Sequence, residues 1–235
     1  MFDLHTHILP GIDDGSKDTQ MSIDMLREEI RGGAQGIALT PHFYADMMDL
    51  EVFKERRRRS FERTIEAVRH ADLNAPHFIL GAEVHYFRGI GRSTSLKELT
   101  LGNSNYILLE LPFGTWPGNI LEEIDNIMEL QGLNVIIAHV ERYLDRDRIK
   151  DIIDNEDLIK QSNAEFFTDR RASRKELKML KEGKIQLLGS DCHNTKYRRP
   201  DLHEAVEIIE KKLGREYIDE INERSAGIFR EAGQT

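Results

Sequence analysis

Short apolar runs alternate with amphipathic helical stretches along this 235-residue chain, and this alternation restricts its fold more than any other feature. The runs are rich in branched residues and almost continuously apolar, which is typical of buried parallel strands. Seven can be recognised, of which Leu158–Asn163 is the weakest: Met1–His5, Gly36–Thr40, Phe78–Glu83, Tyr106–Leu111, Val135–His139, Leu158–Asn163 and Ile185–Ser190. Repeated strand-helix units predict an α/β fold, a distorted seven-stranded (β/α) barrel covered by helices.

Composition narrows the possible partners and the location. A net charge of −9 provides no basic surface for a nucleic-acid backbone, so nucleic acid is not an expected partner. The single cysteine, Cys192, excludes an internal disulfide, and no apolar segment reaches the roughly 20 residues of a membrane span. We therefore expect a cytoplasmic protein without direct membrane insertion, as one domain; a homo-oligomer remains possible.

Residues that bind metal ions follow most of the predicted strands. His5 and His7 lie two apart at the first strand, and Asp191 and His193 repeat this spacing after the last, so that each pair can reach the same side. The other candidates also lie at or after strand ends: Asp14, His42, Glu83, Glu110 and His139. A single histidine there is more often a hydrogen-bonding loop residue, but nine such residues at one end of a barrel indicate a multinuclear metal site.

Five motifs carry a resemblance to a known family: Asp3-Leu4-His5-Thr6-His7 with Asp13-Asp14, Thr40-Pro41-His42, Gly81-Ala82-Glu83, Ala138-His139-Val140-Glu141-Arg142, and Ser190-Asp191-Cys192-His193-Asn194. As a set they resemble the PHP (polymerase and histidinol phosphatase) superfamily. More narrowly, the chain is similar to bacterial metal-dependent protein-tyrosine phosphatases encoded with capsular and exopolysaccharide synthesis genes. The resemblance implies one PHP phosphatase domain over 1–235, a distorted seven-stranded barrel and three divalent ions, often manganese, with iron or zinc also compatible. It implies as substrate the tyrosine-rich tail of a partner tyrosine kinase.

The resemblance also implies which residues hold each ion. His5, His7, Glu83 and Asp191 correspond to the ligands of the first ion, and Glu83 would bridge to a second ion held by Glu110 and His139. A third ion would be bound by Asp14, His42 and His193. Small-molecule histidinol phosphatases tend to carry histidines at the positions of Asp14 and Glu110, which favours the tyrosine phosphatase branch. The chain departs from the family pattern at 165–171.

Simple charge counting agrees with a phosphatase. Three divalent ions and four carboxylates leave an excess of positive charge that attracts a phosphate dianion. A metal-bound hydroxide can attack phosphorus directly, because coordination lowers the pKa of water from about 15.7 to about 7. Arg142 and Arg198 are the candidates for binding phosphate oxygens; Arg198 is preferred to Arg199 only on family spacing. The alternative for Arg142 is a surface ion pair with Glu141 or Asp145.

Several alternatives remain open at this point. Cys192 to Arg198 satisfies the Cys-x5-Arg pattern of cysteine-dependent phosphatases, although the stretch lacks the glycines of a phosphate loop. The substrate could instead be a small phosphomonoester such as histidinol phosphate, or the chain could be a phosphodiesterase or a metal-binding scaffold. The arginine run 56–59 is expected to be mostly solvated. The aromatic residues at 43–44 and 113–116 could flank a phenyl phosphate or plug the barrel rim.

Overall fold

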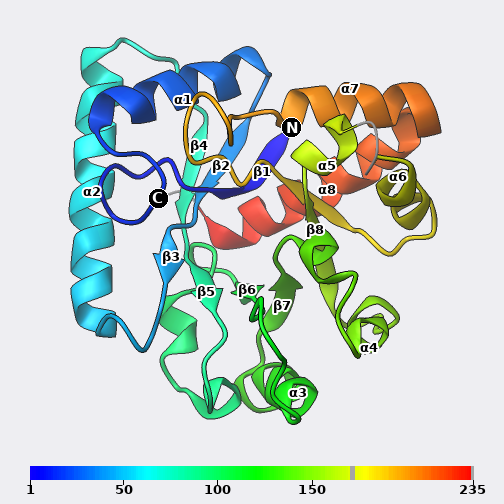
Figure 1. Ribbon diagram of the computed structural model, residues 1–235. Coiled ribbons are helices and arrows are strands. Elements are labelled where there is room, and N and C mark those ends of the chain that lie inside the picture. The colour runs from blue at the N-terminus through cyan, green and yellow to red at the C-terminus, as the bar shows by residue number, and fades with distance from the viewer. Residues whose placement is uncertain (170–172, 234–235) are drawn as a thin grey trace.

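A computed structural model describes residues 1–169 and 173–233 and contains all seven predicted strands (Figure 1). The strands are β1 (Phe2–Thr6), β2 (Gly36–Leu39), β3 (His42–Phe43), β4 (His77–Leu80), β5 (Glu83–His85), β6 (Tyr106–Glu110), β7 (Asn134–Ile137), β8 (Ile159–Asn163) and β9 (Leu187–Gly189). The predicted strand 78–83 is interrupted at Gly81 and Ala82, so that it forms β4 and then β5. The predicted strand 36–40 likewise continues, after Pro41, as the short β3.

Within the described residues the strands form two sheets in which every pairing is parallel. One has the order β1-β2-β4 and the other the order β3-β5-β6-β7-β8-β9. At the far edge an isolated parallel bridge joins Thr6 to Cys192, and the amide of His7 donates to the carbonyl of Cys192 over 3.0 Å. The chain is thus an α/β protein with a curled parallel sheet, and closure into a seven-stranded barrel stays a prediction.

Helices cover the outside of the curled sheet. They are α1 (Thr19–Arg31), α2 (Leu50–His70), α3 (Ile120–Gln131), α4 (Ile149–Ile153), α5 (Glu165–Thr168), α6 (Ser173–Lys181), α7 (Leu202–Leu213) and α8 (Arg215–Ala232), with 3₁₀ turns at Ile90–Arg92, Leu96–Glu98 and Val140–Tyr143. Figure 1 shows α1 and α2 on one side, α7 and α8 on the other, and α3 and α4 beside the later strands. Aspartates begin α1 and α2: Asp18 and Asp49 accept backbone N–H groups of the first turn.

The alternation of side chains along each strand divides the interior into two cores. One core contains residues of six strands and three residues of α8, and its buried members are Leu4, Ala38, Ile79, Leu101, Leu108, Ile136, Ala138, Leu187, Ile228, Phe229 and Ala232. Neighbouring strand residues such as Ile37 and Leu109 belong to the other core, under the outer helices. Six strands can meet in one cluster only if the sheet curls around it. Because the ring of Phe229 packs against that of Phe2 at the start of β1, with centroids 5.0 Å apart, α8 covers the amino ends of the strands and leaves the carboxyl ends free.

Candidate metal centre

The first cluster lies at the carboxyl ends of the strands and contains His5, His7, Glu83 and Asp191, each with a side chain at most 2% exposed. His5 Nε2 lies 3.1 Å from both His7 Nε2 and Glu83 Oε2. Asp191 Oδ1 lies 3.4 Å from His5 Nε2 and 3.3 Å from His7 Nε2. Ligands about 2.0 to 2.1 Å from one ion, at the corners of a tetrahedron, are about 3.3 Å apart. The four atoms therefore have the mutual spacing of ligands around one ion.

A second group surrounds the other oxygen of Glu83. His139 Nε2 lies 2.9 Å from Glu83 Oε1 and 3.5 Å from Glu110 Oε1, which brings together the three residues expected there. His42 also reaches this group, because it clusters with Glu83 and Glu110, although its Nδ1 lies 2.9 Å from Glu83 Oε2, the oxygen that faces the first cluster. His85 was predicted to be an ordinary hydrogen-bonding residue. The structure confirms this, because His85 Nδ1 lies 2.8 Å from Glu110 Oε2. It thereby fixes the orientation of that carboxylate.

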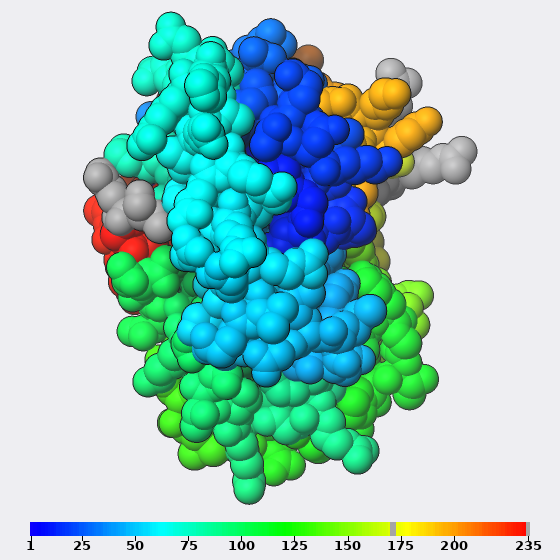
Figure 2. All heavy atoms as spheres, turned by 90° about the vertical axis from the view of Figure 1, so that its left-hand side faces the viewer, coloured from blue at the N-terminus to red at the C-terminus, as the bar shows by residue number. Residues whose placement is uncertain are grey.

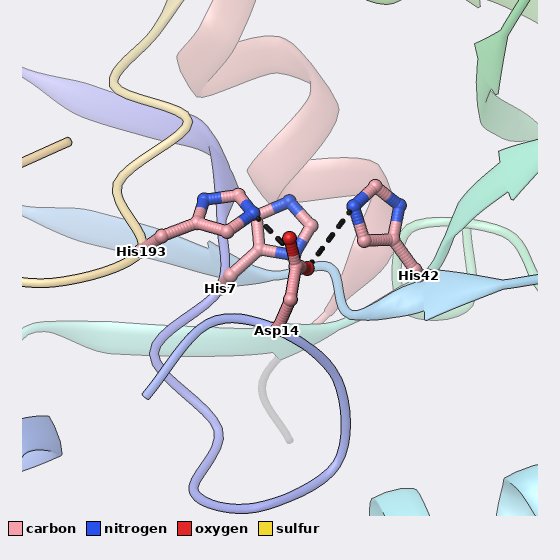
Figure 3. A group of neighbouring side chains, drawn as sticks. All are labelled: His7, Asp14, His42 and His193. Atoms are coloured by element: carbon pink, nitrogen blue, oxygen red, sulfur yellow. Dashed lines mark ion pairs between the residues drawn. The ribbon is translucent and has the colours of Figure 1, made fainter. Parts of the chain in front are cut away.

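The third group is more open and includes Asp14, His42 and His193, as expected, together with His7 (Figure 3). Asp14 Oδ1 lies 3.5 Å from His42 Nε2 and 3.4 Å from His193 Nε2, and its side chain is 67% exposed. Asp14 comes from the loop after β1, whereas His42 begins β3 and His193 follows β9. Three separate segments thus converge on one carboxylate.

Buried oxygen atoms without hydrogen-bond partners show that the first cluster fits a cation. Glu83 Oε2 and Asp191 Oδ1 are buried, and the imidazole nitrogens that lie 2.9 to 3.5 Å from them among the described residues do not form hydrogen bonds of normal geometry with them. Burial by itself raises a carboxyl pKa, but the neighbouring histidines outweigh it, beginning with His5, and hold the pKa of Glu83 and of Asp191 well below the ordinary range. Charged carboxylates are rarely left unpaired in a protein interior. Divalent ions would satisfy both oxygens, and the donor set of imidazoles and carboxylates suits such ions.

A row of polar side chains behind the ligands holds them in position. His5 Nδ1 pairs with Gln161 Oε1 over 3.1 Å, and Gln161 Nε2 donates to Asn163 over 3.0 Å. Asn163 Nδ2 in turn donates to Asp191 Oδ2 over 2.7 Å. Gln161 and Asn163 were not predicted to contribute to the site. The sequence does contain a sign of their role. Both are polar residues, two positions apart in a strand that is predicted to be buried, and buried polar side chains require hydrogen-bond partners.

Asp13 supports the outer part of the site. It accepts from His7 Nδ1 over 2.8 Å and from the amide of His42 over 3.0 Å, so it orients one imidazole and anchors the start of β3. Gly15 permits this loop to fold back, because a Cβ atom there would lie 2.3 Å from the carbonyl oxygen of His7. Only glycine fits such a close approach without displacing the backbone.

Helix α2 braces the same loop. Ser60 Oγ and Arg63 Nη2 donate to the carbonyl of Pro10 over 2.8 and 2.7 Å, and Arg56 Nη2 donates to that of Ile12 over 3.2 Å. Figure 2 shows the loop after β1, in dark blue, lying beside α2, in cyan. The expectation that the arginine run 56–59 is mostly solvated is confirmed, because Arg56, Arg58 and Arg59 are exposed and only Arg57 is partly buried. Arg57 donates to the carbonyl of Gly81 over 2.6 Å, because curling of the sheet brings loops against α2.

Two of the candidate ligands have an unusual backbone conformation. His139 has φ of 33° and Asp191 has φ of 52°, in the left-handed region that residues other than glycine adopt at a cost of about 1 to 3 kcal/mol. Each follows a short strand and turns its side chain toward the cluster. Such strain persists where the surrounding structure enforces it, and these two candidate ligands share it with Asp72 and Arg148 outside the site.

Both predicted arginines lie at the site. Arg142 Nη2 and Arg198 Nη2 lie 2.8 and 2.6 Å from the same atom, Asp191 Oδ2, and their side chains are 23% and 31% exposed. Arg142 pairs with Asp191, and more distantly with Glu165, in place of the surface pairing with Glu141 or Asp145. Arg199 points to Glu204 over 2.6 Å, which separates it from Arg198. Two partly exposed guanidinium groups therefore face the metal cluster.

The cysteine alternative is not supported. Cys192 is fully buried, and burial raises the pKa of its thiol well above the ordinary range, which disfavours the thiolate that a nucleophile requires. The segment 165–171, where the sequence departs from the family pattern, contains α5 up to Thr168, while Arg170 and Arg171 lie outside the described residues. No helix among the described residues is long and apolar enough to cross a membrane.

Comparison with known proteins agrees with this geometry. Residues 1–228 match the family described as "Capsular polysaccharide synthesis, CpsB/CapC". The chain belongs to this family. It is 28% identical to the tyrosine-protein phosphatase CpsB of Streptococcus agalactiae, over 94% of both chains. It is 27% identical to the tyrosine-protein phosphatase YwqE of Bacillus subtilis, over 100% of this chain and 96% of the relative.

A solved structure confirms the kinship at the level of the fold. The chain superposes with a TM-score of 0.83 and 25% identity on a structure from a study of YwqE and CpsB of Streptococcus pneumoniae, covering 100% of this chain and 96% of the other. That study describes these proteins as unique metal-dependent tyrosine phosphatases. The CpsB/CapC family thus confirms the branch that the motifs indicated, and the histidinol phosphatase alternative is not favoured.

Proposed function

We propose that this protein is a metal-dependent phosphatase that hydrolyses phosphotyrosine on a partner protein, a tyrosine kinase of capsule or exopolysaccharide synthesis. The observation that carries the proposal is the first cluster, where two buried carboxylate oxygens without hydrogen-bond partners lie 3.1 to 3.4 Å from two imidazole nitrogens. The named activities of its relatives in the CpsB/CapC family support the choice of substrate.

The proposed site holds three divalent ions, with manganese favoured and iron or zinc compatible. His5, His7, Glu83 and Asp191 would bind the first ion, Glu83, Glu110 and His139 the second, and Asp14, His42 and His193 the third. The two oxygens of Glu83 face different groups, which supports its role as a bridge. His42 contacts residues of both the second and the third group, which supports the proposal that their ions lie close together.

When bound, divalent ions supply positive charge beside the phosphoryl group and make water more acidic. The chain contributes the two arginines. Their guanidinium groups already share Asp191 Oδ2, which fixes their direction, and their remaining N–H groups stay available for phosphate oxygens. A tyrosyl leaving group has an ordinary pKa of about 10, so it departs as an anion at modest cost. The chain therefore needs chiefly to hold the phosphate and stabilise the charge that develops on it.

We further propose that the curled sheet closes as a seven-stranded barrel in a single domain over 1–235. The bridge from Thr6 to Cys192, together with the amide of Asp191 donating to the carbonyl of His5 over 2.8 Å, supports closure between β1 and β9. The cytoplasmic location stays a prediction from the sequence.

The decisive experiment removes the metals with a chelator and restores Mn²⁺, Fe²⁺ or Zn²⁺ one at a time. We expect hydrolysis of a phosphotyrosine peptide to disappear with the chelator and return with at least one metal, while histidinol phosphate remains a poor substrate. Elemental analysis of the same samples gives the number of ions per chain. Activity that survives complete metal removal would refute the proposal, and preference for histidinol phosphate would refute the substrate.

A further inference from the structure

A cavity of about 430 Å³ opens directly beside the third group of candidate ligands. Asp13, Asp14 and His42 form its polar end, and the remaining lining is mainly apolar: Ile12, Tyr44, Met47, Met48 and Phe53. The walls come from the loop after β1, from β3 and the segment that follows it, and from the start of α2. A ligand held at Asp14 and His42 therefore has an apolar space next to it.

Met47 is exposed in a way that packing does not explain. Its side chain is 78% exposed, whereas Phe53 in the same cavity is 1% exposed and belongs to the core. A large apolar side chain at the edge of a polar site indicates a surface that is covered when a ligand binds. A methionine thioether is flexible and makes favourable contacts with aromatic rings.

The walls of the cavity are held by contacts within the protein. The carbonyl of Tyr44 accepts the amides of both Met47 and Met48 over 3.0 Å, which closes a tight turn. The Tyr44 ring lies 5.2 Å from the His42 ring and 5.2 Å from the His85 ring, measured between centroids. Arg56 lies between the two walls, because its Nη1 is 3.8 Å from Met48 Sδ while its Nη2 holds the carbonyl of Ile12. The cavity is thus preformed.

We propose that this cavity receives the phenyl ring of phosphotyrosine, and that Tyr44, Met47 and Met48 make the site prefer aryl over alkyl phosphates. The inference rests on the proposed function, because it requires the phosphoryl group to be held beside Asp14 and His42. The ester oxygen joins that group directly to the ring, so the ring must occupy space adjoining those two residues. The mainly apolar lining next to them provides it.

Phe113 offers the competing wall. It is 45% exposed, but its ring already stacks on His139, with centroids 5.8 Å apart and planes inclined by 20°, and on Tyr143 at 5.9 Å. One face of Phe113 is therefore occupied by the protein itself. The cavity at Met47 is open to a ligand, and we assign the ring to it.

The test uses the metal-loaded full chain and two non-hydrolysable probes, phenylphosphonate and methylphosphonate, with binding measured by calorimetry. We expect wild-type protein to bind phenylphosphonate more tightly. Met47→Ser and Met48→Ala should each lower this preference roughly 3- to 10-fold by removing apolar contact, with the Kd for methylphosphonate unchanged. The ratio of kcat/KM for a phosphotyrosine peptide to that for the matching phosphoserine peptide should fall in parallel. Leu130→Ser, which removes a 64% exposed side chain from α3, is the matched control and should change neither ratio.

The outcomes separate the two proposals. If both methionine variants keep the wild-type preference, or if Phe113→Ala alone abolishes it, the assignment of the ring to this cavity is overturned while phosphatase activity stands. If wild-type protein neither binds the phosphonates nor hydrolyses the phosphotyrosine peptide with any metal, the proposed function fails and this inference fails with it. Loss of preference in the methionine variants together with retention in Leu130→Ser supports the assignment.

Discussion

The inner and outer parts of the metal centre are built in different ways. The first cluster lies on strand ends with side chains at most 2% exposed, whereas Asp14 in the third group comes from a loop and is 67% exposed. Hydrogen-bonded strands fix the first, and contacts from α2 to Pro10 and Ile12 fix the second. The inner cluster is therefore held by the sheet itself, while the outer group depends on one loop that α2 holds in place.

The side chains that hold the ligands in position also come from the sheet in the inner cluster and from a loop in the outer group. Gln161 and Asn163, which tie His5 to Asp191, are buried residues of β8. Asp13, which supports the outer group, belongs to the same loop as the ligand Asp14. We therefore expect the ion of the outer group to bind more weakly and to exchange first.

Replacing Glu83 should have the largest effect. Glu83→Ala removes a carboxylate that faces two groups of ligands, so more than one ion per chain should be lost, and kcat/KM on a phosphotyrosine peptide should fall on the order of 1,000-fold or more. Elemental analysis and kinetics check this. Glu129→Ala, at an exposed position of α3, is the control. Equal metal content in the two variants would contradict the bridging assignment.

Asp14→Asn tests the outer group alone. The amide keeps the size of the side chain but loses its charge, so we expect about one ion per chain to be lost while the inner cluster stays occupied. Activity should fall roughly 100-fold, less than in Glu83→Ala. Anomalous diffraction from crystals of the variant shows which ion has gone. A variant that loses the inner ions first would reverse the comparison.

Arginine replacements measure what the chain itself contributes to phosphate binding. Arg142→Lys and Arg198→Lys keep the charge but lose the planar fork, so each should lower kcat/KM roughly 10- to 150-fold, or about 1.4 to 3 kcal/mol, with metal content unchanged. Arg58→Lys, on the exposed face of α2, should change little. Rates near wild type in both site variants would show that the arginines do not bind the phosphate.

The smallest predicted effect is the pH dependence of stability in the metal-free protein. Burial alone would lower the pKa of His139, but Glu110 and Glu83 outweigh it and raise that pKa from 6.5 to about 9. Because the folded pKa is raised, the stabilisation is complete below pH 6.5 and is lost as the pH rises through about 9. We expect the free energy of unfolding to fall by about 1 to 3 kcal/mol across this range.

The metal-loaded protein should not show this loss, because a metal ligand is a neutral imidazole at both pH values. Urea unfolding with and without chelator, at pH values from 6.5 to 9, gives the comparison. Buried Glu176, whose pKa burial raises to about 7, affects both forms alike and cancels in the difference. If the free energy of unfolding fell equally with rising pH in the metal-free and metal-loaded forms, protonation of His139 would not be what stabilises the metal-free site.

The local pattern of the chain was sufficient to predict the strands and the nine candidate ligands. The carboxyl ends of parallel strands meet at one edge, so residues such as His5, Glu110 and His193 could be expected to converge before any distance was known. The interruption between β4 and β5 could not be predicted in the same way. The interruption lies where the chain passes from the sheet that contains β4 to the sheet that contains β5, and the short-range pattern of apolar residues does not indicate that point.

Contacts between segments far apart in the chain could not be predicted from local patterns. Arg56 and Arg63 are exposed residues of a charged helix, and their hydrogen bonds to the carbonyls of Ile12 and Pro10 exist because curling of the sheet brings that loop against the helix. The pairing of Arg198, and not Arg199, with Asp191 likewise depends on the turn of one loop. Which residue types stand at the strand ends could be predicted from local patterns, because it follows from side-chain alternation and hydrophobic burial. Long-range geometry determined which partner each of them meets.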